Sequence, residues 1–458
     1  EAVVRIGTFE KENYLKEMGV RLTSILGWAE RGGASASGHG NSVPRFHITW
    51  GTGPGLVEPF SRFVLEKEQE GQFKFLPRHQ VTDIGIEHNQ VTHISGIILE
   101  PSDVERGEKS SRTVIDTFHY EVDELLITSG GIGANMPLIR KYWPKRLGNP
   151  PKTMIQGVPD STDGHLIQVT EDAGANIVNK DRMWHYTEGI QNHSPIWSNH
   201  GIRIIPGPSS MWFDATGKRM AAPDYPGFDT LHTLETIMKT GYDYSWFILT
   251  EDIIKKEFVL SGSEQNPDLT DKDIKLLLQE RLGSKATSPV EAFMDKGPDF
   301  ILADDLGTLV RKMNDLAGND LLNYETIKHE IKARDLQIDN PFTKDPQVAF
   351  INNARQFLGD KLVRTAKPHK ILSGRNGRLI AVKLNIISRK TLGGIQTNLD
   401  GQALNPSMQP IQGLYAAGEA SGFGGGGVHG YRALEGTFLG GCIFSGIRAA
   451  EGIHHHIQ

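Results

Sequence analysis

The feature that most constrains this 458-residue sequence is a glycine-dense segment near its C-terminus, residues 413–441. Residues 414–417 have the pattern of a buried strand, and a turn with four consecutive glycines follows at 424–427. Small and apolar residues from about Thr437 predict a final helix. Glycines let the backbone approach a ligand closely because they carry no Cβ. A helix that begins after such a turn directs free N–H groups towards an electron-rich ligand. The segment therefore predicts a site for a large, flat ligand.

The composition is that of a globular protein that handles small molecules. The net charge is only −6 and the basic residues are dispersed, so neither nucleic acid nor an anionic membrane is an expected partner. The single cysteine, Cys442, excludes an intramolecular disulfide, and its apolar surroundings predict a buried thiol. The histidines at 454–456 have no spaced partners, so no metal site is expected. No apolar run is long enough for a membrane span and no signal peptide precedes residue 10, which favours a cytoplasmic location.

The order of sequence patterns predicts an α/β protein. Residues 9–19 and the segment from Trp50 onwards have apolar residues at helical spacing. A buried strand that starts near residue 124 leads into a glycine turn. Strand-like alternation is expected before it, at residues 72–76, 81–86, 91–99 and 118–122.

The pattern changes at residue 207 and returns to the earlier type near residue 390. This middle region holds a strand pair around 211–219 and helical segments at 231–239, 271–282, 305–316 and 322–335. We interpret it as a second domain inserted into the first. The expected division is residues 1–206, 207–390 and 391–458.

Five glycine-containing motifs occur in an order that is typical of one superfamily. They are LITSGGIGAN at 126–135, DGH at 163–165, GKR at 217–219, TLGG at 391–394 and GLYAAGE at 413–419. This succession closely resembles that of flavoproteins of the fumarate reductase, succinate dehydrogenase and 3-ketosteroid dehydrogenase superfamily. The glycine run before 428–430 and the segment 433–441 resemble its ketosteroid-dehydrogenase-like branch of FAD-binding dehydrogenases. The resemblance covers essentially the whole chain. It implies an α/β fold in which a split, Rossmann-like FAD-binding domain holds an inserted α+β capping domain.

The resemblance also implies which residues hold FAD. The Glu419 carboxylate matches one that accepts hydrogen bonds from cofactor hydroxyl groups, and residues 436–439 match amides that meet the pyrimidine edge of the flavin and stabilise its reduced form. Val81 and residues 128–131 match the adenosine half. The expected FAD-binding residues are Val81, Thr128, Ser129, Gly130, Gly131, Gly393, Gly394, Gly418, Glu419, Gly436, Thr437, Phe438 and Leu439. A tight turn explains each glycine cluster alone equally well. For Glu419, an acid at the start of a helix is the weaker alternative.

Titratable residues beside these motifs are the candidates for catalysis. They are Tyr431, His429, Arg432 and Lys390. His185, in an aromatic segment at 183–188, is a further titratable side chain of interest. A tyrosine or histidine near the flavin can move a proton while hydride passes to the ring. The alternative is that the tyrosine and histidines are packed in a turn or core and that the cations are solvated.

Three departures from the superfamily's fumarate reductases argue against a small dicarboxylate substrate. Lys390 stands where those enzymes carry a histidine before the glycine motif. Arg432 comes one position before the expected substrate-binding arginine, where this chain has Ala433. The segment 246–255 contains no arginine that could act as the catalytic acid.

A further departure concerns the N-terminus. FAD enzymes of this type begin with a strand, a Gly-x-Gly-x-x-Gly turn and a helix that binds the pyrophosphate. Residues 51–55 (GTGPG) resemble this turn, but they lack its last glycine and have no apolar strand in the expected place before them. The sequence therefore predicts a chain that starts after a βαβ unit of roughly 30 residues. A truncated gene product, a fragment or a mis-started reading frame would each explain such a start.

The sequence-based prediction is an FAD-dependent oxidoreductase. The expected reaction is hydride transfer between flavin N5 and a carbon next to a carbonyl, on a steroid-like or other apolar enone. Its partners are a small-molecule substrate and an unknown electron acceptor. Two alternatives stay open: a fumarate-reductase-like enzyme that acts on a small unsaturated acid, and a non-enzymatic relic that cannot hold FAD.

Overall fold

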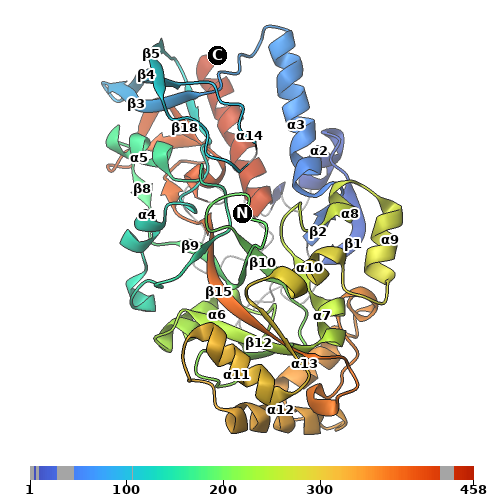
Figure 1. The fold of residues 1–458 in the computed structure, drawn as a ribbon. Helices are drawn as coiled ribbons and strands as arrows, with labels where there is room; N and C mark the ends of the chain where they lie inside the picture. Colours follow the sequence, from blue (N-terminus) through green and yellow to red (C-terminus); the bar gives the residue numbers. More distant parts are fainter. Residues whose placement is uncertain (1–4, 7–9, 28–45, 106, 423–437) are drawn as a thin grey trace.

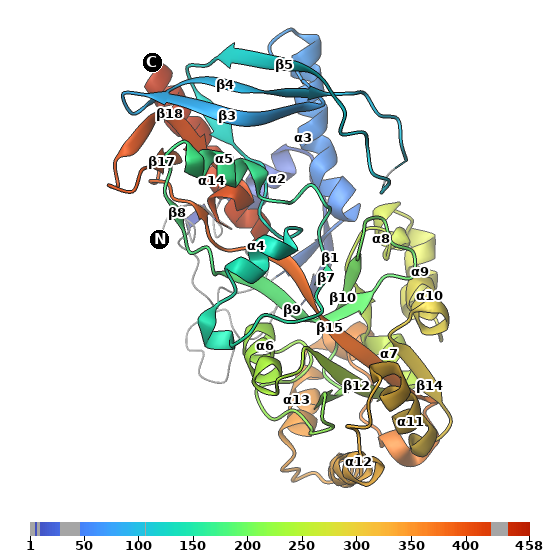
Figure 2. The same ribbon diagram turned by 60° about the vertical axis from the view of Figure 1, so that its left-hand side comes forward.

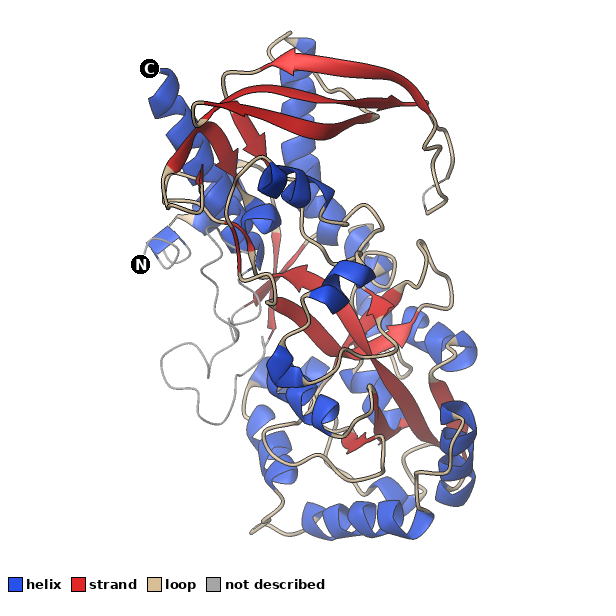
Figure 3. Ribbon diagram, turned by 90° about the vertical axis from the view of Figure 1, so that its left-hand side faces the viewer, coloured by secondary structure: helices blue, strands red, loops and turns tan. Residues whose placement is uncertain are grey.

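A computed structural model describes residues 5–6, 10–27, 46–105, 107–422 and 438–458. The described chain forms two large sheets, one above the other in Figure 1, and two separate two-stranded sheets. Helices cover both large sheets (Figure 3). The strand β15, Leu379–Thr391, runs from the lower sheet up towards the upper one (Figure 2). Elements that lie far apart in the sequence therefore meet where β15 ends.

The upper sheet combines a meander with two parallel strands. The meander is antiparallel and consists of β3 (His79–Glu87), β4 (Gln90–Leu99) and β5 (Val114–Glu121). β18, Pro410–Ala416, lies parallel to both β4 and the short β6, Leu125–Ile127. β17, Gln402–Leu404, completes the order β17-β18-β4-β3. This arrangement confirms the α/β core with its β-meander.

The lower sheet is built around β15. Its order is β11-β12-β15-β9-β10-β13, with β7 and β14 also paired to β15. The strands are β7 (Ile155–Gln156), β9 (Met183–Gln191), β10 (Gly201–Ile205), β11 (Met211–Asp214), β12 (Tyr244–Thr250), β13 (Val259–Leu260) and β14 (Phe300–Ala303). It takes strands from both sides of residue 206, and the division of the chain at that residue stays a prediction.

Eight of the described helices surround the lower sheet. They are α6 (Thr230–Lys239), α7 (Glu251–Glu257), α8 (Pro267–Thr270), α9 (Ile274–Leu282), α10 (Ser288–Lys296), α11 (Leu306–Ala317), α12 (Tyr324–Ile338) and α13 (Pro346–Ala354). Asp229, Asp305 and Asn323 each accept a hydrogen bond from a first-turn N–H, which satisfies a donor that has no partner within the helix. The helices expected at 231–239, 271–282, 305–316 and 322–335 are thus present.

The helices of the upper part flank its sheet (Figure 1). α14, Phe438–Ile457, packs against β18, and α5, His165–Asp172, packs against β3. The short α4, Met136–Lys141, follows the glycine turn after β6. No helix in the described ranges is both long and apolar enough to cross a membrane.

Two expectations for the N-terminal region are wrong. Residues 72–76 form no strand, because Phe73 and Phe75 lie exposed and the Phe75 N–H donates to the Glu68 side chain instead of a neighbouring strand. A strand does precede the glycines at 51–55. It is β2, Phe46–Thr49, and it pairs antiparallel with β1, Leu22–Gly27.

These glycines begin α3, Thr52–Gln69, for reasons of packing. Gly51 has φ +94°, and a Cβ on Gly55 would lie 2.3 Å from the Trp50 carbonyl oxygen. The antiparallel β1–β2 pair shows that this strand, turn and helix are not the first half of a parallel βαβ unit. The helix expected near residues 9–19 is also present, as α2 (Lys11–Glu17).

Candidate functional site

Two of the glycine motifs meet at the carboxyl ends of neighbouring parallel strands. β6 and β18 pair in register, with Leu414 opposite Leu125 and Ala416 opposite Ile127. Residues 128–131 follow β6, and the turn at Gly418–Ser421 follows β18. In open parallel sheets, ligands bind in the crevice outside the carboxyl ends of the strands. The tertiary structure therefore brings these two sets of expected FAD-binding residues to one edge.

Thr391, at the end of β15, links the two turns. Its hydroxyl oxygen accepts a hydrogen bond from the Ile132 N–H at 2.9 Å, and its own N–H donates to Glu419 Oε1 at 2.7 Å. A Cβ on Gly131 would lie 2.1 Å from the Thr391 hydroxyl and 2.7 Å from Glu419 Oε1. Residue 131 must be glycine because the three strand ends approach each other this closely.

Glu419 is a half-buried carboxylate held by backbone. Burial raises its pKa, while the Thr391 N–H and the nearby Lys390 and Arg389 oppose this rise. Gly418 positions it with φ +67° and donates its N–H to the Ser445 hydroxyl of α14 at 2.9 Å. A carboxylate has several lone-pair sites, so this contact to Thr391 leaves capacity for ligand hydroxyl groups.

The neighbouring glycines are explained by the packing of the chain itself. A Cβ on Gly393 would lie 2.1 Å from the Asn179 carbonyl oxygen, and one on Gly394 would lie 2.4 Å from that of Ala420. These contacts require glycine without any ligand. Their expected place against the flavin ring stays a prediction.

The residues expected at the adenosine half lie along β3 and after β6. Thr128 and Ser129 are exposed, so their polar groups are open to a ligand. The Val81 carbonyl oxygen lies 2.8 Å from His165 Nε2, at the start of α5. The Asp163 carboxylate accepts a hydrogen bond from the His165 N–H at 2.9 Å. The motif at 163–165 thereby fixes α5 against β3.

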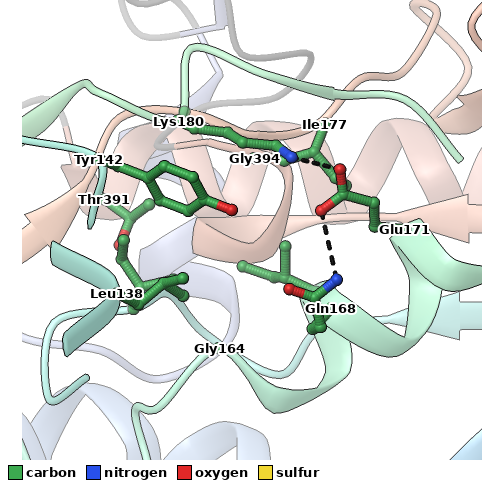
Figure 4. Close-up of a pocket in the computed structure, with 12 residues that line it drawn as sticks. Leu138, Tyr142, Gly164, Gln168, Glu171, Ile177, Lys180, Thr391 and Gly394 are labelled. Atoms are coloured by element: carbon green, nitrogen blue, oxygen red, sulfur yellow. Dashed lines mark hydrogen bonds and ion pairs between the residues drawn. The ribbon is translucent and has the colours of Figure 1, made fainter.

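A small cavity of about 30 Å³ opens beside these motifs (Figure 4). Thr391, Gly393 and Gly394 line it, and so do Lys180 and Glu171, which form an ion pair. Partial burial lowers the pKa of the Lys180 ammonium group. The hydrogen bond and the negative charge of Glu171 have a larger combined effect, so the pKa is raised overall. Space of this size holds about one water molecule. A ligand as large as FAD would therefore lie along the exposed strand ends and not inside this cavity.

Lys390 lies in an aromatic environment next to Glu419. Its Nζ is 5.2 Å from the centroid of the Phe438 ring and 5.6 Å from that of Tyr186. Phe438 is the first residue of α14 and packs against the buried cluster of Trp184, Tyr186, Leu231 and Leu392. The structure thus brings two expected site residues, Lys390 and Phe438, together at the start of the last helix. Leu439, the next residue, is half exposed.

The sequence analysis missed a buried charged group beside Lys390. The Arg203 guanidinium lies 3.6 Å from the centroid of the Tyr186 ring, and its Nε is 3.9 Å from Glu188 Oε2. Arg389 lies 5.9 Å from the same ring. Arg203 and Glu188 are both almost fully buried. The alternation of Trp184, Tyr186 and Glu188 on one face of a strand was the signal that could have identified this group.

His185 points to the opposite face of β9 and is removed from this group. It is 2% exposed and stacks on Trp143, with ring centroids 5.3 Å apart. Burial lowers its pKa to about 3, so the imidazole is neutral at physiological pH. Neither ring nitrogen has a hydrogen-bond partner among the described residues. The suggestion that His185 moves a proton at the site is not supported.

Cys442 is half-buried on α14. Burial raises the pKa of its thiol to about 11, so it is protonated and unreactive near neutral pH. Five expected site residues lie outside the described part of the chain: His429, Tyr431, Arg432, Gly436 and Thr437.

Comparison with known proteins identifies the class to which this fold and site belong. The FAD binding domain family model matches residues 7–439, which is most of the chain. The chain therefore belongs to this FAD-binding family. The exposed strand ends, the Glu419 carboxylate and the glycine turns suit the family's cofactor, FAD.

Two relatives narrow the class further. A KsdD-like steroid dehydrogenase of Mycobacterium tuberculosis (strain ATCC 25618 / H37Rv) is 52% identical over 457 residues, which cover 100% of this chain and 80% of that protein. One of Mycolicibacterium smegmatis is 52% identical over 438 residues, 96% of this chain and 79% of that protein. These relatives confirm the expected branch and, at the level of the family, the class of FAD-dependent oxidoreductases.

Solved structures support the fold. The 3-ketosteroid delta1-dehydrogenase of Sterolibacterium denitrificans aligns with a TM-score of 0.59 at 17% identity, over 89% of this chain and 64% of that one. A flavocytochrome c3 fumarate reductase aligns with a TM-score of 0.59 at 15% identity. The alignment covers 99% of this chain and 63% of that one. This chain thus spans slightly less than two thirds of the length of either structure. The expected fold, a mixed helix and sheet architecture with an FAD-binding domain, is confirmed.

Proposed function

We propose that this chain forms the core of an FAD-dependent dehydrogenase that acts on a CH–CH bond next to a carbonyl. The observation that carries the proposal is the meeting of Thr391, Glu419 and the turns after β6 and β18 at one open sheet edge. The names of the relatives support a steroid-like substrate. FAD, when bound, supplies the hydride acceptor or donor, and the chain's own residues bind, orient and protonate.

Residues at the edge have distinct roles in this proposal. Glu419 accepts hydrogen bonds from cofactor hydroxyl groups, and the turn at 128–131 lines the adenosine half of the cofactor. Phe438 and Leu439 lie at the start of α14, where the positive end of the helix dipole favours electron density. Lys390 places a positive charge beside them, where it stabilises negative charge that develops during the reaction.

The surroundings of Lys390 favour an apolar substrate. Aromatic rings flank its ammonium group, and the adjacent cluster consists of large apolar side chains. Arg203 and Arg389 both lie near Tyr186, which is the kind of arrangement a small diacid needs. The Glu188 carboxylate next to Arg203 neutralises one of these charges, so the pair makes a poor clamp for a dicarboxylate. The alternative of a fumarate-reductase-like enzyme is therefore less well supported.

The first test is whether the chain retains FAD. The protein is desalted and its visible spectrum is recorded with and without added FAD. A bound flavin band supports the proposal, and a folded protein that stays colourless with added FAD contradicts it for this chain and favours the relic. Glu419→Ala should weaken FAD binding by about tenfold or more, because hydrogen bonds to a charged group are strong. Glu451→Ala, on the outer side of α14, serves as the control.

The second test concerns the reaction. A 3-ketosteroid and fumarate are supplied in parallel, with a redox dye as the electron acceptor or donor, and turnover is measured spectrophotometrically. Tyr431→Phe, His429→Ala and Lys390→Met should each slow flavin reduction by about tenfold or more without loss of FAD. Unchanged rates in all three variants would remove these residues from the proposed mechanism.

A further inference from the structure

A second cavity lies away from the FAD edge, at the junction of α2, α3 and α8. It measures about 220 Å³ and is lined by Gly19, Arg21, Trp50, Gly55, Glu58, Pro59, Arg62 and Lys272. It is several times larger than the cavity beside Thr391. α3 and α8 meet beside it, on the right-hand side of Figure 1. The residues that carry charge around it come from three separate segments of the chain.

The lining carries an excess of positive charge. Arg21, Arg62 and Lys272 contribute three cations, and Glu58 contributes one carboxylate. Lys272 Nζ lies 3.4 Å from Glu58 Oε2, and Arg62 Nε lies 4.0 Å from Glu66 Oε1. Both ion pairs are exposed, so they hold these cations only weakly and leave their donors available.

The backbone around the cavity is fixed. The Trp50 N–H donates to the Arg21 carbonyl oxygen at 2.9 Å, at the end of the β1–β2 pair. The Gly51 N–H donates to the Leu269 carbonyl oxygen of α8 at 3.0 Å. The Thr52 hydroxyl lies 2.8 Å from that of Thr270 and 3.0 Å from that of Ser263. The cations therefore surround a cavity with an ordered frame.

Gly19 and Gly55 both line the cavity. Gly19 has φ +91°, and a Cβ there would lie 3.8 Å from Arg62 Nη2. Gly55 lies against the Trp50 carbonyl group, where a Cβ would overlap the carbonyl oxygen. The cavity that they line exceeds the volume of a single water molecule many times over.

We propose that this cavity binds a small, doubly charged oxyanion, namely phosphate, either free or as a simple monoester. Guanidinium groups form charge-assisted, bidentate hydrogen bonds with phosphate oxygens, and an ammonium group adds a point charge. The anion bridges Arg21 and Arg62 of the N-terminal segment to Lys272 of the segment after α8. It thereby strengthens the contact between α3 and α8. This site is separate from the proposed FAD edge and does not depend on the proposed reaction.

Calorimetric titration of the FAD-loaded or FAD-free protein tests the proposal. Inorganic phosphate and glycerol 3-phosphate are the probes, and sodium chloride at matched ionic strength corrects for screening. Saturable binding is expected in the wild type. Arg21→Gln and Arg62→Gln should each weaken it by about tenfold, while Glu58→Gln should strengthen it, because the single carboxylate in the lining is lost. Arg375→Gln, an exposed arginine that does not line the cavity, should leave it unchanged.

Hydrogen exchange gives a second readout. Phosphate should slow exchange of the amides at residues 267–273 in the wild type but not in the Arg62→Gln variant. Circular dichroism confirms that each variant is folded. Preferential binding of glycerol 3-phosphate identifies a monoester, and equal binding identifies free phosphate. Absence of saturable binding, or binding that survives the Arg21→Gln/Arg62→Gln double variant, overturns the proposal.

Discussion

The edge formed by β6, β18 and Thr391 and the core of the lower sheet are stabilised in different ways. At the edge, short hydrogen bonds join backbone to small side chains, and Thr128 and Ser129 stay exposed. In and around the lower sheet, aromatic side chains such as Trp246 of β12 are fully buried, together with ionisable groups such as Glu257 of α7. The first region keeps polar groups open for a ligand, and the second excludes water. Substitutions at the edge should therefore affect ligand binding, whereas substitutions in the core should affect the free energy of unfolding.

The largest effect is expected from Glu257→Ala in the lower region. Glu257 Oε1 accepts hydrogen bonds from the Ser209 hydroxyl at 2.6 Å and the Ala366 N–H at 2.7 Å, and its charge lies near buried Arg364. Removal of the carboxylate leaves buried donors without an acceptor, so we expect a loss of about 3–5 kcal/mol in the free energy of unfolding. Denaturant unfolding measures it, with the exposed Asp320→Ala as the control. A loss below about 1 kcal/mol would contradict this role.

The pH dependence of stability tests the same carboxyl group. Burial raises the pKa of Glu257 from its usual 4.5 to about 7, although the Ser209 and Ala366 donors and Arg364 oppose the rise. The folded protein then binds a proton that the unfolded chain has released. This contribution is complete below pH 4.5 and is lost as the pH rises through 7, by on the order of 3 kcal/mol.

Unfolding experiments between pH 4.5 and 8 measure this slope, and Glu257→Gln should flatten it. If wild type and Glu257→Gln have the same slope, the carboxyl group does not titrate in this range.

A smaller loss of stability, with a larger effect on the ligand, is expected from Gly131→Ala. The new Cβ overlaps the Thr391 hydroxyl and Glu419 Oε1, so the strand ends must move apart. We expect a loss of about 1–3 kcal/mol in the free energy of unfolding, together with release of FAD on desalting. Thermal unfolding and the flavin spectrum measure the two effects. Retention of FAD by this variant would separate the Thr391–Glu419 contact from cofactor binding.

The smallest effect, of opposite sign, is expected from Gly446→Ala in α14. A Cβ at this position meets no atom within 4 Å, and its φ is not in the left-handed region. Alanine favours a helix by about 0.5–1 kcal/mol relative to glycine, so the melting temperature should rise slightly. A decrease would show that this part of α14 needs a glycine for a contact with a ligand or partner.

The sequence alone determined the family and most of the elements. The alternation in residues 81–86 and 91–99 predicted β3 and β4, and the apolar spacing from Leu414 and from Thr437 predicted β18 and α14. Local patterns of this kind depend on the periodicity of a strand or helix, which neighbouring residues define. The alternating aromatic residues at 72–76 led to the wrong prediction of a strand. Periodicity does not reveal whether a neighbouring strand is present to pair with such a segment.

Only the tertiary structure decided which residues meet. Thr391 and Glu419 are 28 positions apart and Ile132 is more distant still, yet one threonine bonds to both of the others. Arg203 and Glu188 belong to no recognisable sequence motif. Arg21, Arg62 and Lys272 are far apart in the sequence, so no local pattern indicated that they line one cavity. Contacts of this kind depend on how strands and helices pack over long sequence separations, which no local pattern encodes. The glycine-rich C-terminal motif identified the family, whereas the convergence of three strand ends at one edge of the upper sheet is the basis of the proposed site.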